Sequence, residues 1–162
     1  MEEIFKRRSI REYTDEVISD EDIKLIIKAG MNAPSAHNMR PTYYVVVNDK
    51  DKLKELSIIN KYGKMLEHAS HAIVVCAKEA TDFWFEDASA STLNILLQAT
   101  SLNIGSCWVG LYPTDTEKKV KECLNIPNDV RAFSIVSLGY PLKERNINDF
   151  YEEDRIKHNM WK

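Results

Sequence analysis

The sequence predicts one domain, residues 1–162, in which helices cover a buried β-sheet in a fold of the α/β or α+β class. Two observations support this prediction. A chain of 162 residues is long enough to form one domain with a hydrophobic core. Short apolar runs alternate with amphipathic segments, and buried strands separated by helices indicate a sheet with covered faces. No internal repeat, low-complexity tract or linker divides the sequence.

The strands are predicted from short apolar runs. The run TYYVVVN at 42–48 is rich in β-branched and aromatic residues, which favour strands, and we expect it to be buried. The run HAIVVCAK at 71–78 is expected to be a second buried strand. Two further strands are predicted at 106–111 and 131–139.

The helices are predicted from amphipathic segments and their capping residues. The segment 18–30 has Ser19 as a possible N-cap, acidic residues in its first turn and a stripe of isoleucines. The longest segment, 85–103, has Asp87 near its start as an expected cap, followed by small residues that permit close helix packing. The other helical or turn segments are expected at 2–8, 49–58, 62–70 and 114–125.

Composition and charge argue against several classes of protein. The chain has 22 basic and 25 acidic residues, whereas a nucleic-acid binder usually shows a basic excess. No apolar run is long enough to cross a bilayer, and no signal peptide is visible. Cys76, Cys107 and Cys123 have no metal-binding spacing and indicate reduced thiols, so we expect a cytoplasmic protein without a metal site.

The segment KRRSIR, residues 6–11, places four cations within six residues of an acidic chain. These cations could simply complement the C-terminal dipole of a short helix. They could also bind an anion, because arginine binds phosphate oxygens in bidentate fashion and Ser9 adds a hydroxyl donor. A phosphate needs several donors, and a second basic loop, GYPLKER, follows a predicted strand and supplies Lys143 and Arg145. A nucleic-acid arm has no support elsewhere in the sequence.

Four motifs occur in a fixed order along the chain: RRSIREY, APSAHNMRP, DASASTLNILLQATSLNIGSCWVG and LGYPLKER. Together they resemble the FMN-dependent nitroreductase superfamily over nearly the whole chain. The resemblance implies an α+β, nitroreductase-like fold with a mixed central sheet flanked by helices. It also implies an intertwined homodimer with a flavin at each end of the interface.

The resemblance further implies which residues contact FMN. Arg7, Arg8 and Ser9 match the segment that faces the phosphate, and Arg11 matches the cation that reaches the pyrimidine edge of the ring. The segment that lies along the isoalloxazine of the partner subunit is matched by Pro34, Ser35, Ala36 and Asn38. The backbone stretch beside the ring is matched by Cys107, Trp108, Val109 and Gly110. The cations on the phosphate side are matched by Lys143 and Arg145.

The implied activity is hydride transfer from NADH or NADPH, through bound FMN, to a nitroaromatic, a quinone or a similar small-molecule acceptor. No catalytic acid or base is expected in the protein, since the cofactor carries the chemistry and a fixed arginine stabilises the reduced flavin. The sequence also lacks the GxSxG, HExxH, GxGxxG and P-loop motifs. The alternative is a flavin-binding carrier or redox sensor with little turnover.

Several residues have more than one interpretation. His37 could contact the flavin or substrate, or could simply be exposed. His68 and His71 in HASH are interpreted as a surface turn, and Cys107 as a buried thiol rather than a nucleophile. The chain is short for the superfamily and carries Arg40 where relatives often have glutamine, which adds positive charge. The aromatic residues of the tail, residues 149–162, are expected to pack against a partner subunit.

Overall fold

The computed structural model describes residues 2–79, 82–112, 115–143, 147 and 149–161. Its centre is a four-stranded sheet with the order β1-β2-β4-β3. The strands are β1 Thr42–Val47, β2 His71–Lys78, β3 Gly105–Gly110 and β4 Val130–Gly139. Each predicted strand is therefore confirmed, with ends that differ from the predicted ones by at most one residue.

The helices fall close to the predicted segments. The α-helices are α1 Glu3–Lys6, α2 Asp20–Met31, α3 Lys50–Ile59, α4 Trp84–Ser101 and α5 Thr116–Leu124. The 3₁₀ turns are η1 Ala36–Asn38, η2 Lys64–His68 and η3 Glu153–Arg155. The predicted cap of α2 is confirmed, because the Ser19 hydroxyl accepts a hydrogen bond of 3.1 Å from the Asp22 amide. None of the described helices is long and apolar enough to span a bilayer.

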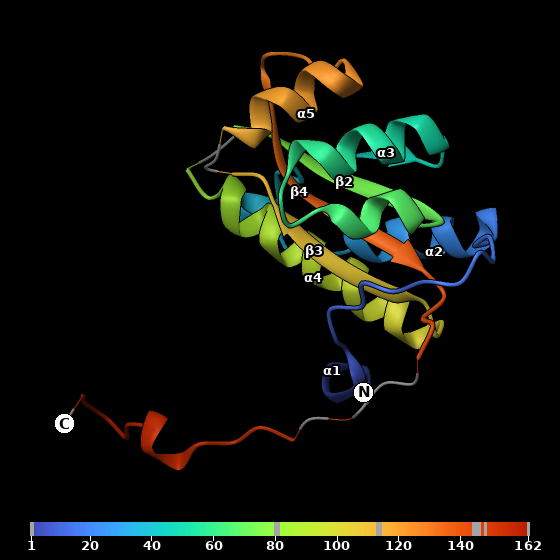
Figure 1. Ribbon diagram of the computed structural model, residues 1–162. Coiled ribbons are helices and arrows are strands. Elements are labelled where there is room, and N and C mark those ends of the chain that lie inside the picture. The colour runs from blue at the N-terminus through green and yellow to red at the C-terminus, as the bar shows by residue number, and fades with distance from the viewer. Residues whose placement is uncertain (1, 80–81, 113–114, 144–146, 148, 162) are drawn as a thin grey trace.

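Helices cover both faces of the sheet (Figure 1). α2 and α4 lie on one face, and α3 and α5 lie on the other. Residues of the strands alternate between two separate cores, apart from an irregularity in the pairing of β2 with β4 beside Cys76. Cys107 and Val109 of β3 join the core beneath α3 and α5, whereas Trp108 packs with the core beneath α2 and α4. The α+β class is therefore confirmed.

Two expectations about the sheet need correction. All four strands pair antiparallel, so the sheet is not mixed, and within the described residues a parallel pairing occurs only at the isolated bridge between Ser9 and Ser106. β1 is also not a buried strand. It lies at an edge of the sheet, and its Tyr43 side chain is 51% exposed. Strand-forming residues alone do not reveal this position, because edge and central strands use the same β-branched and aromatic residues.

The C-terminal segment leaves the body of the subunit (Figure 1). Residues 149–161 are exposed throughout, and the Trp161 side chain is 88% exposed. The packing of this tail against a second subunit stays a prediction.

Candidate functional site

The N-terminal basic segment lies along the outer edge of β3. The amide of Ile10 donates a 2.9 Å hydrogen bond to the Ser106 carbonyl, beside the Ser9–Ser106 bridge. Further along, the Tyr13 hydroxyl bonds to the Ile10 carbonyl at 2.6 Å and to the Ser137 hydroxyl at 2.7 Å. These contacts fix the backbone on both sides of Arg11.

Two glycines permit this close approach. A Cβ atom at Gly105 would lie 2.8 Å from the Ile10 side chain, and one at Gly139 would lie 2.6 Å from the Tyr13 ring. Both distances are shorter than a Cβ contact allows, so any larger residue would push the N-terminal segment away from the sheet. Gly139 belongs to the motif LGYPLKER, which therefore has a structural role in addition to its basic residues.

A cavity of about 530 Å³ opens beside β3. Its lining residues are Arg11, Lys61, Tyr62, Lys64, Met65, Cys107, Trp108, Val109 and Gly110. The structure thus brings Arg11 together with the whole predicted stretch 107–110. Three cations at one cavity favour an anionic or electron-rich ligand.

The sequence-based prediction missed Lys61, Tyr62 and Lys64. Lys61 and Tyr62 come from the connection between α3 and η2, and Lys64 is the first residue of η2. The Lys61 ammonium lies 4.9 Å from the centre of the Tyr62 ring. The only signal in the sequence was a pair of lysines around a glycine, in KYGK. That spacing matches no phosphate-binding motif, so the fold is needed to place these residues next to Arg11.

The Cys107 thiol lies on the inner side of the cavity. Burial raises the pKa of the Cys107 thiol above its ordinary value, although the nearby Arg11 acts in the opposite direction. A raised pKa keeps the thiol protonated and weakly nucleophilic. The interpretation of Cys107 as a buried thiol is therefore confirmed.

The guanidinium of Arg8 is not fully hydrogen-bonded by the described part of the chain. Nη1 of Arg8 donates to the carbonyls of Phe5 and Arg7, at 3.1 and 2.5 Å. Nη2 of Arg8 is buried and has no partner within the described residues, and the hydroxyl of Ser106 is in the same situation. A charged donor without an acceptor is unfavourable in a protein interior, so this segment has spare capacity to bind an anion.

The second basic loop lies beside the first. The Leu142 amide donates to the Glu12 carbonyl at 3.1 Å, and the Lys143 ammonium pairs with the Glu12 carboxylate at 2.8 Å. This hydrogen bond to Glu12 raises the pKa of Lys143. The predicted neighbourhood of the two basic segments is therefore present for Lys143. Arg145 lies outside the described residues.

The loop 34–38 lies on the other side of the sheet. The Ala36 amide donates a 2.9 Å hydrogen bond to the Asp87 carboxylate of α4, whereas the cavity residues Met65 and Cys107 pack in the core beneath α3. One chain thus holds the two predicted halves of the flavin site on opposite faces. His37 and Asn38 in this loop are exposed.

Asp87 does not have its predicted role as a helix cap. Helix α4 begins at Trp84, its N-cap is Phe83, and no side chain caps it. Asp87 lies in the first turn and is buried, with its carboxylate turned toward the loop at Ala36. The helix starts one residue earlier than the sequence suggested, so Asp87 lies inside its first turn. There the carboxylate meets the Ala36 amide, 51 residues away in the sequence.

His71 is also placed differently from the prediction. His68 is exposed, but His71 is the first residue of β2 and is buried. Its Nδ1 atom lies 2.9 Å from the Ser70 hydroxyl, and that hydroxyl accepts a hydrogen bond from the Ile18 amide. Burial lowers the pKa of His71 below its ordinary value. This histidine stabilises the start of β2 rather than forming a surface turn.

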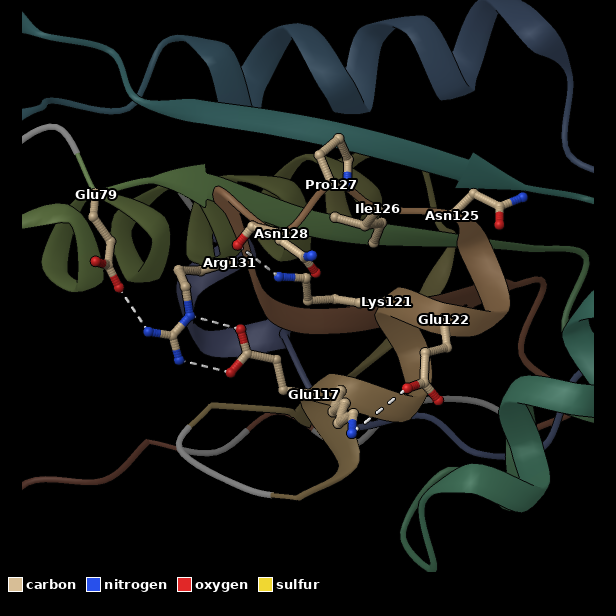
Figure 2. A pocket seen from close by; sticks show the side chains of 10 residues that line it. Glu79, Glu117, Lys121, Glu122, Asn125, Ile126, Pro127, Asn128 and Arg131 are labelled. Carbon is tan, nitrogen blue, oxygen red and sulfur yellow. Dashed lines mark hydrogen bonds and ion pairs between the residues drawn. The ribbon is translucent and has the colours of Figure 1, made fainter.

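A larger cavity, of about 720 Å³, lies elsewhere, beside α5 and β4 (Figure 2). Most of its charged groups are already paired with one another. Arg131 binds Glu117 through two hydrogen bonds of 2.7 and 2.8 Å and binds Glu79 at 2.6 Å. Lys121 donates to the Asn128 carbonyl at 3.1 Å. The Arg131 cluster therefore has a structural role, because its guanidinium is bound by two carboxylates of the chain.

The fold and the cavity define a small α+β protein with a basic cavity at the outer edge of its sheet. Residues 4–140 match the family described as the Nitroreductase family, and the chain belongs to this family.

Similar proteins cover nearly the whole chain. A protein of Archaeoglobus fulgidus, provisionally named an NADH dehydrogenase/NAD(P)H nitroreductase, is 48% identical over 98% of this chain and 96% of its own length. The structure of an FMN-dependent nitroreductase from Clostridium difficile has a TM-score of 0.93 at 34% identity and covers 98% of each chain. The structure of a provisionally named nitroreductase from Desulfovibrio desulfuricans, in complex with FMN, has a TM-score of 0.84 at 26% identity. The match covers 99% of this chain and 96% of that one.

Proposed function

We propose that the protein is an NAD(P)H-dependent FMN oxidoreductase that reduces nitroaromatics, quinones or similar small acceptors. The family, the relatives named NAD(P)H nitroreductase and the FMN-bound neighbour support the class of enzyme and the cofactor. The observation that carries the proposal is the cavity where Arg11 meets residues 107–110, three residues along the chain from Arg8, whose buried Nη2 has no partner within the described residues. The choice of acceptor rests on the resemblance alone.

The residues present fit FMN. The cofactor has one charged end, its phosphate, and one electron-rich end, its ring. The Nη2 of Arg8, which has no partner within the described residues, suits the phosphate, and Lys143 could add a second charge there by exchanging its ion pair with Glu12. The cavity with Arg11, Lys61 and Lys64 suits the ring, and its volume is in the usual range for small-molecule sites. The roles predicted for Arg7, Ser9 and Arg145 belong to the same proposal.

When bound, FMN supplies the hydride chemistry. Arg11 contributes a charge that is permanent at physiological pH, held in place by the backbone hydrogen bonds around Ile10 and Tyr13. A fixed positive charge beside the pyrimidine edge stabilises the reduced cofactor and requires little reorganisation. Lys61 and Lys64 line the same cavity and add to this positive potential. Cys107 takes no part as a nucleophile in this scheme.

We further propose that the enzyme works as a homodimer. The loop 34–38 and the Arg11 cavity lie on opposite faces of one chain, so a site built from both needs a second subunit. The tail offers exposed aromatic residues, among them Phe150 and Trp161, that a partner could cover. Light scattering of the full chain and of a variant that lacks residues 150–162 tests this. A full-length monomer loaded with FMN would refute the shared site.

A flavin carrier or redox sensor is the competing function. Steady-state oxidation of NADH and NADPH, with and without a nitroaromatic or a quinone, separates the two. We expect acceptor-dependent turnover and release of FMN, not FAD, from the denatured protein. Bound FMN with negligible turnover would favour the carrier, and failure to bind FMN would refute both.

The unpaired thiols of Cys76, Cys107 and Cys123 are typical of a reducing compartment, so we place the enzyme in the cytoplasm as part of this proposal.

A further inference from the structure

Asp87 is a buried carboxylate that neither caps its helix nor forms an ion pair within the described residues. Asp87 lies on α4, and the residue is 5% exposed. One oxygen, Oδ1, accepts a 2.9 Å hydrogen bond from the Ala36 amide, and the other, Oδ2, is buried without a partner in the described residues. Burial of a carboxylate is costly, so its retention at this position calls for a specific role.

The loop that Asp87 holds has an unusual backbone. Three of its residues other than glycine have positive φ angles, 52° at His37, 56° at Asn38 and 47° at Arg40. Side chains with a Cβ atom disfavour this region, so the loop needs contacts that stabilise it. Inside the loop, the Ser35 hydroxyl accepts from the Arg40 amide at 2.9 Å, and Arg40 Nε donates to the Asn38 side chain at 3.0 Å.

Those internal bonds do not attach the loop to the rest of the protein. Ser35 occupies the N-cap of η1 but makes no capping bond with its side chain, and the Asp87 carboxylate binds the first amide of that turn instead. One helical turn beyond Asp87, the Ser91 hydroxyl bonds to the Tyr44 hydroxyl at 2.7 Å. α4 therefore contacts the loop through Asp87 and the strand that follows the loop through Ser91, with the two residues spaced i and i+4.

We propose that Asp87 is a positioning residue for the flavin site: its carboxylate fixes the backbone of the loop 35–40 in the conformation that the ring of FMN contacts. This inference rests on the proposed function, because that proposal assigns Ser35, Ala36 and Asn38 to the ring. A preformed loop lowers the ordering cost of binding, so Asp87 contributes to FMN affinity without touching the cofactor.

The test uses three variants of the full-length chain. Asp87→Ala removes the acceptor, Asp87→Asn keeps one side-chain oxygen that can accept from the Ala36 amide, and Glu86→Gln changes an exposed acid one residue away. Hydrogen exchange of the amides at 36–40 is measured without added FMN. The dissociation constant, the visible absorption spectrum and the midpoint potential are measured with FMN.

We expect Asp87→Ala to speed exchange at 36–40 about tenfold and to weaken FMN binding about tenfold. It should also change the flavin spectrum, whereas Asp87→Asn recovers most of the affinity and Glu86→Gln stays within about twofold of the wild type. If Asp87→Ala only lowers the melting temperature and leaves the dissociation constant and spectrum unchanged, Asp87 is structural and the inference is wrong. If the wild-type protein itself binds no FMN, the proposed function fails first, and the exchange data still show whether Asp87 anchors the loop.

Discussion

Arg131 and the N-terminal arginines show how the same side chain serves two purposes in one molecule. Arg131 is saturated, since Glu117 and Glu79 accept from all of its charged nitrogens and its guanidinium lies 4.5 Å from the centre of the Tyr112 ring. Arg8 instead donates to two nearby backbone carbonyls and keeps one buried nitrogen without a partner. Within the described part of the chain, no ion pair joins Arg8 or Arg11 to a carboxylate.

The difference distinguishes a structural cluster from a ligand site. A charge whose partners all come from the chain contributes to folding and has little left for a ligand, even though the larger cavity lies beside it. A charge that lacks a partner is costly until a ligand supplies one. Cavity volume alone would have pointed to the Arg131 cluster, whereas the satisfaction of polar groups points to β3.

The largest expected effect comes from breaking the saturated cluster. Arg131→Met leaves the mostly buried carboxylate of Glu117 without its partner and should lower the free energy of unfolding by about 2–3 kcal/mol. Urea unfolding measures this change. The control is Glu79→Gln, which removes the more exposed partner and should cost less than about 1 kcal/mol. Affinity for FMN should stay within twofold, and a tenfold loss would show that the two regions are not separate.

A smaller effect, on the cofactor rather than on the fold, is expected from Arg11→Ala. Loss of the cation should lower the midpoint potential of bound FMN by about 30 mV, which for a two-electron couple equals about 1.4 kcal/mol, and should slow reduction by NAD(P)H. Spectroelectrochemistry and stopped-flow reduction measure the two quantities. The melting temperature should hardly change, because Arg11 has no ion pair to lose. The exposed Lys24 on α2 provides the control Lys24→Ala, and equal shifts in both variants would contradict a local role for Arg11.

The pH dependence of stability sharpens the comparison from the structural side. Hydrogen bonds from Arg131 and the Ala132 amide outweigh desolvation and hold the pKa of Glu117 below its ordinary value of 4.5. As the pH falls, Glu117 is therefore protonated in the unfolded chain before it is protonated in the folded protein. The contribution of this carboxylate to the free energy of unfolding is complete above about pH 5 and is lost as the pH falls through the folded pKa. Unfolding free energies at pH 7 and pH 4 should differ less in Glu117→Gln than in the wild type. An equal loss in both proteins would assign the acid sensitivity to other carboxylates.

Much of the fold follows from local patterns in the sequence. Apolar runs located the four strands, the Ser19 cap located α2, and Lys143 of the second basic segment contacts Glu12, the residue that follows the first. Each of these features depends on residues close together in sequence or on one strong charge pattern. The motif order added the family, which no single motif defines.

The remaining features depend on the order of the strands, which local patterns do not encode. β1 is half exposed because the order β1-β2-β4-β3 leaves it at an edge. Asp87 meets an amide 51 residues away, and Lys64 reaches the cavity only after η2 packs under α3. His71 looked like part of a surface turn until pairing of β2 with β4 enclosed it.

The smallest expected effect tests whether the cavity contains a reactive group besides its cations. Cys107→Ser replaces a thiol whose pKa burial raises, and a protonated thiol offers neither a nucleophile nor a charge. Turnover and FMN affinity should remain within about twofold of the wild type, since the proposed chemistry resides in the cofactor and Arg11 supplies the charge. The matched control is Cys123→Ser, at a half-buried thiol on α5 whose pKa is raised to about 11. A loss of turnover above tenfold in Cys107→Ser alone, with FMN still bound, would mean that the thiol reacts and that the cavity does more than bind and polarise the flavin.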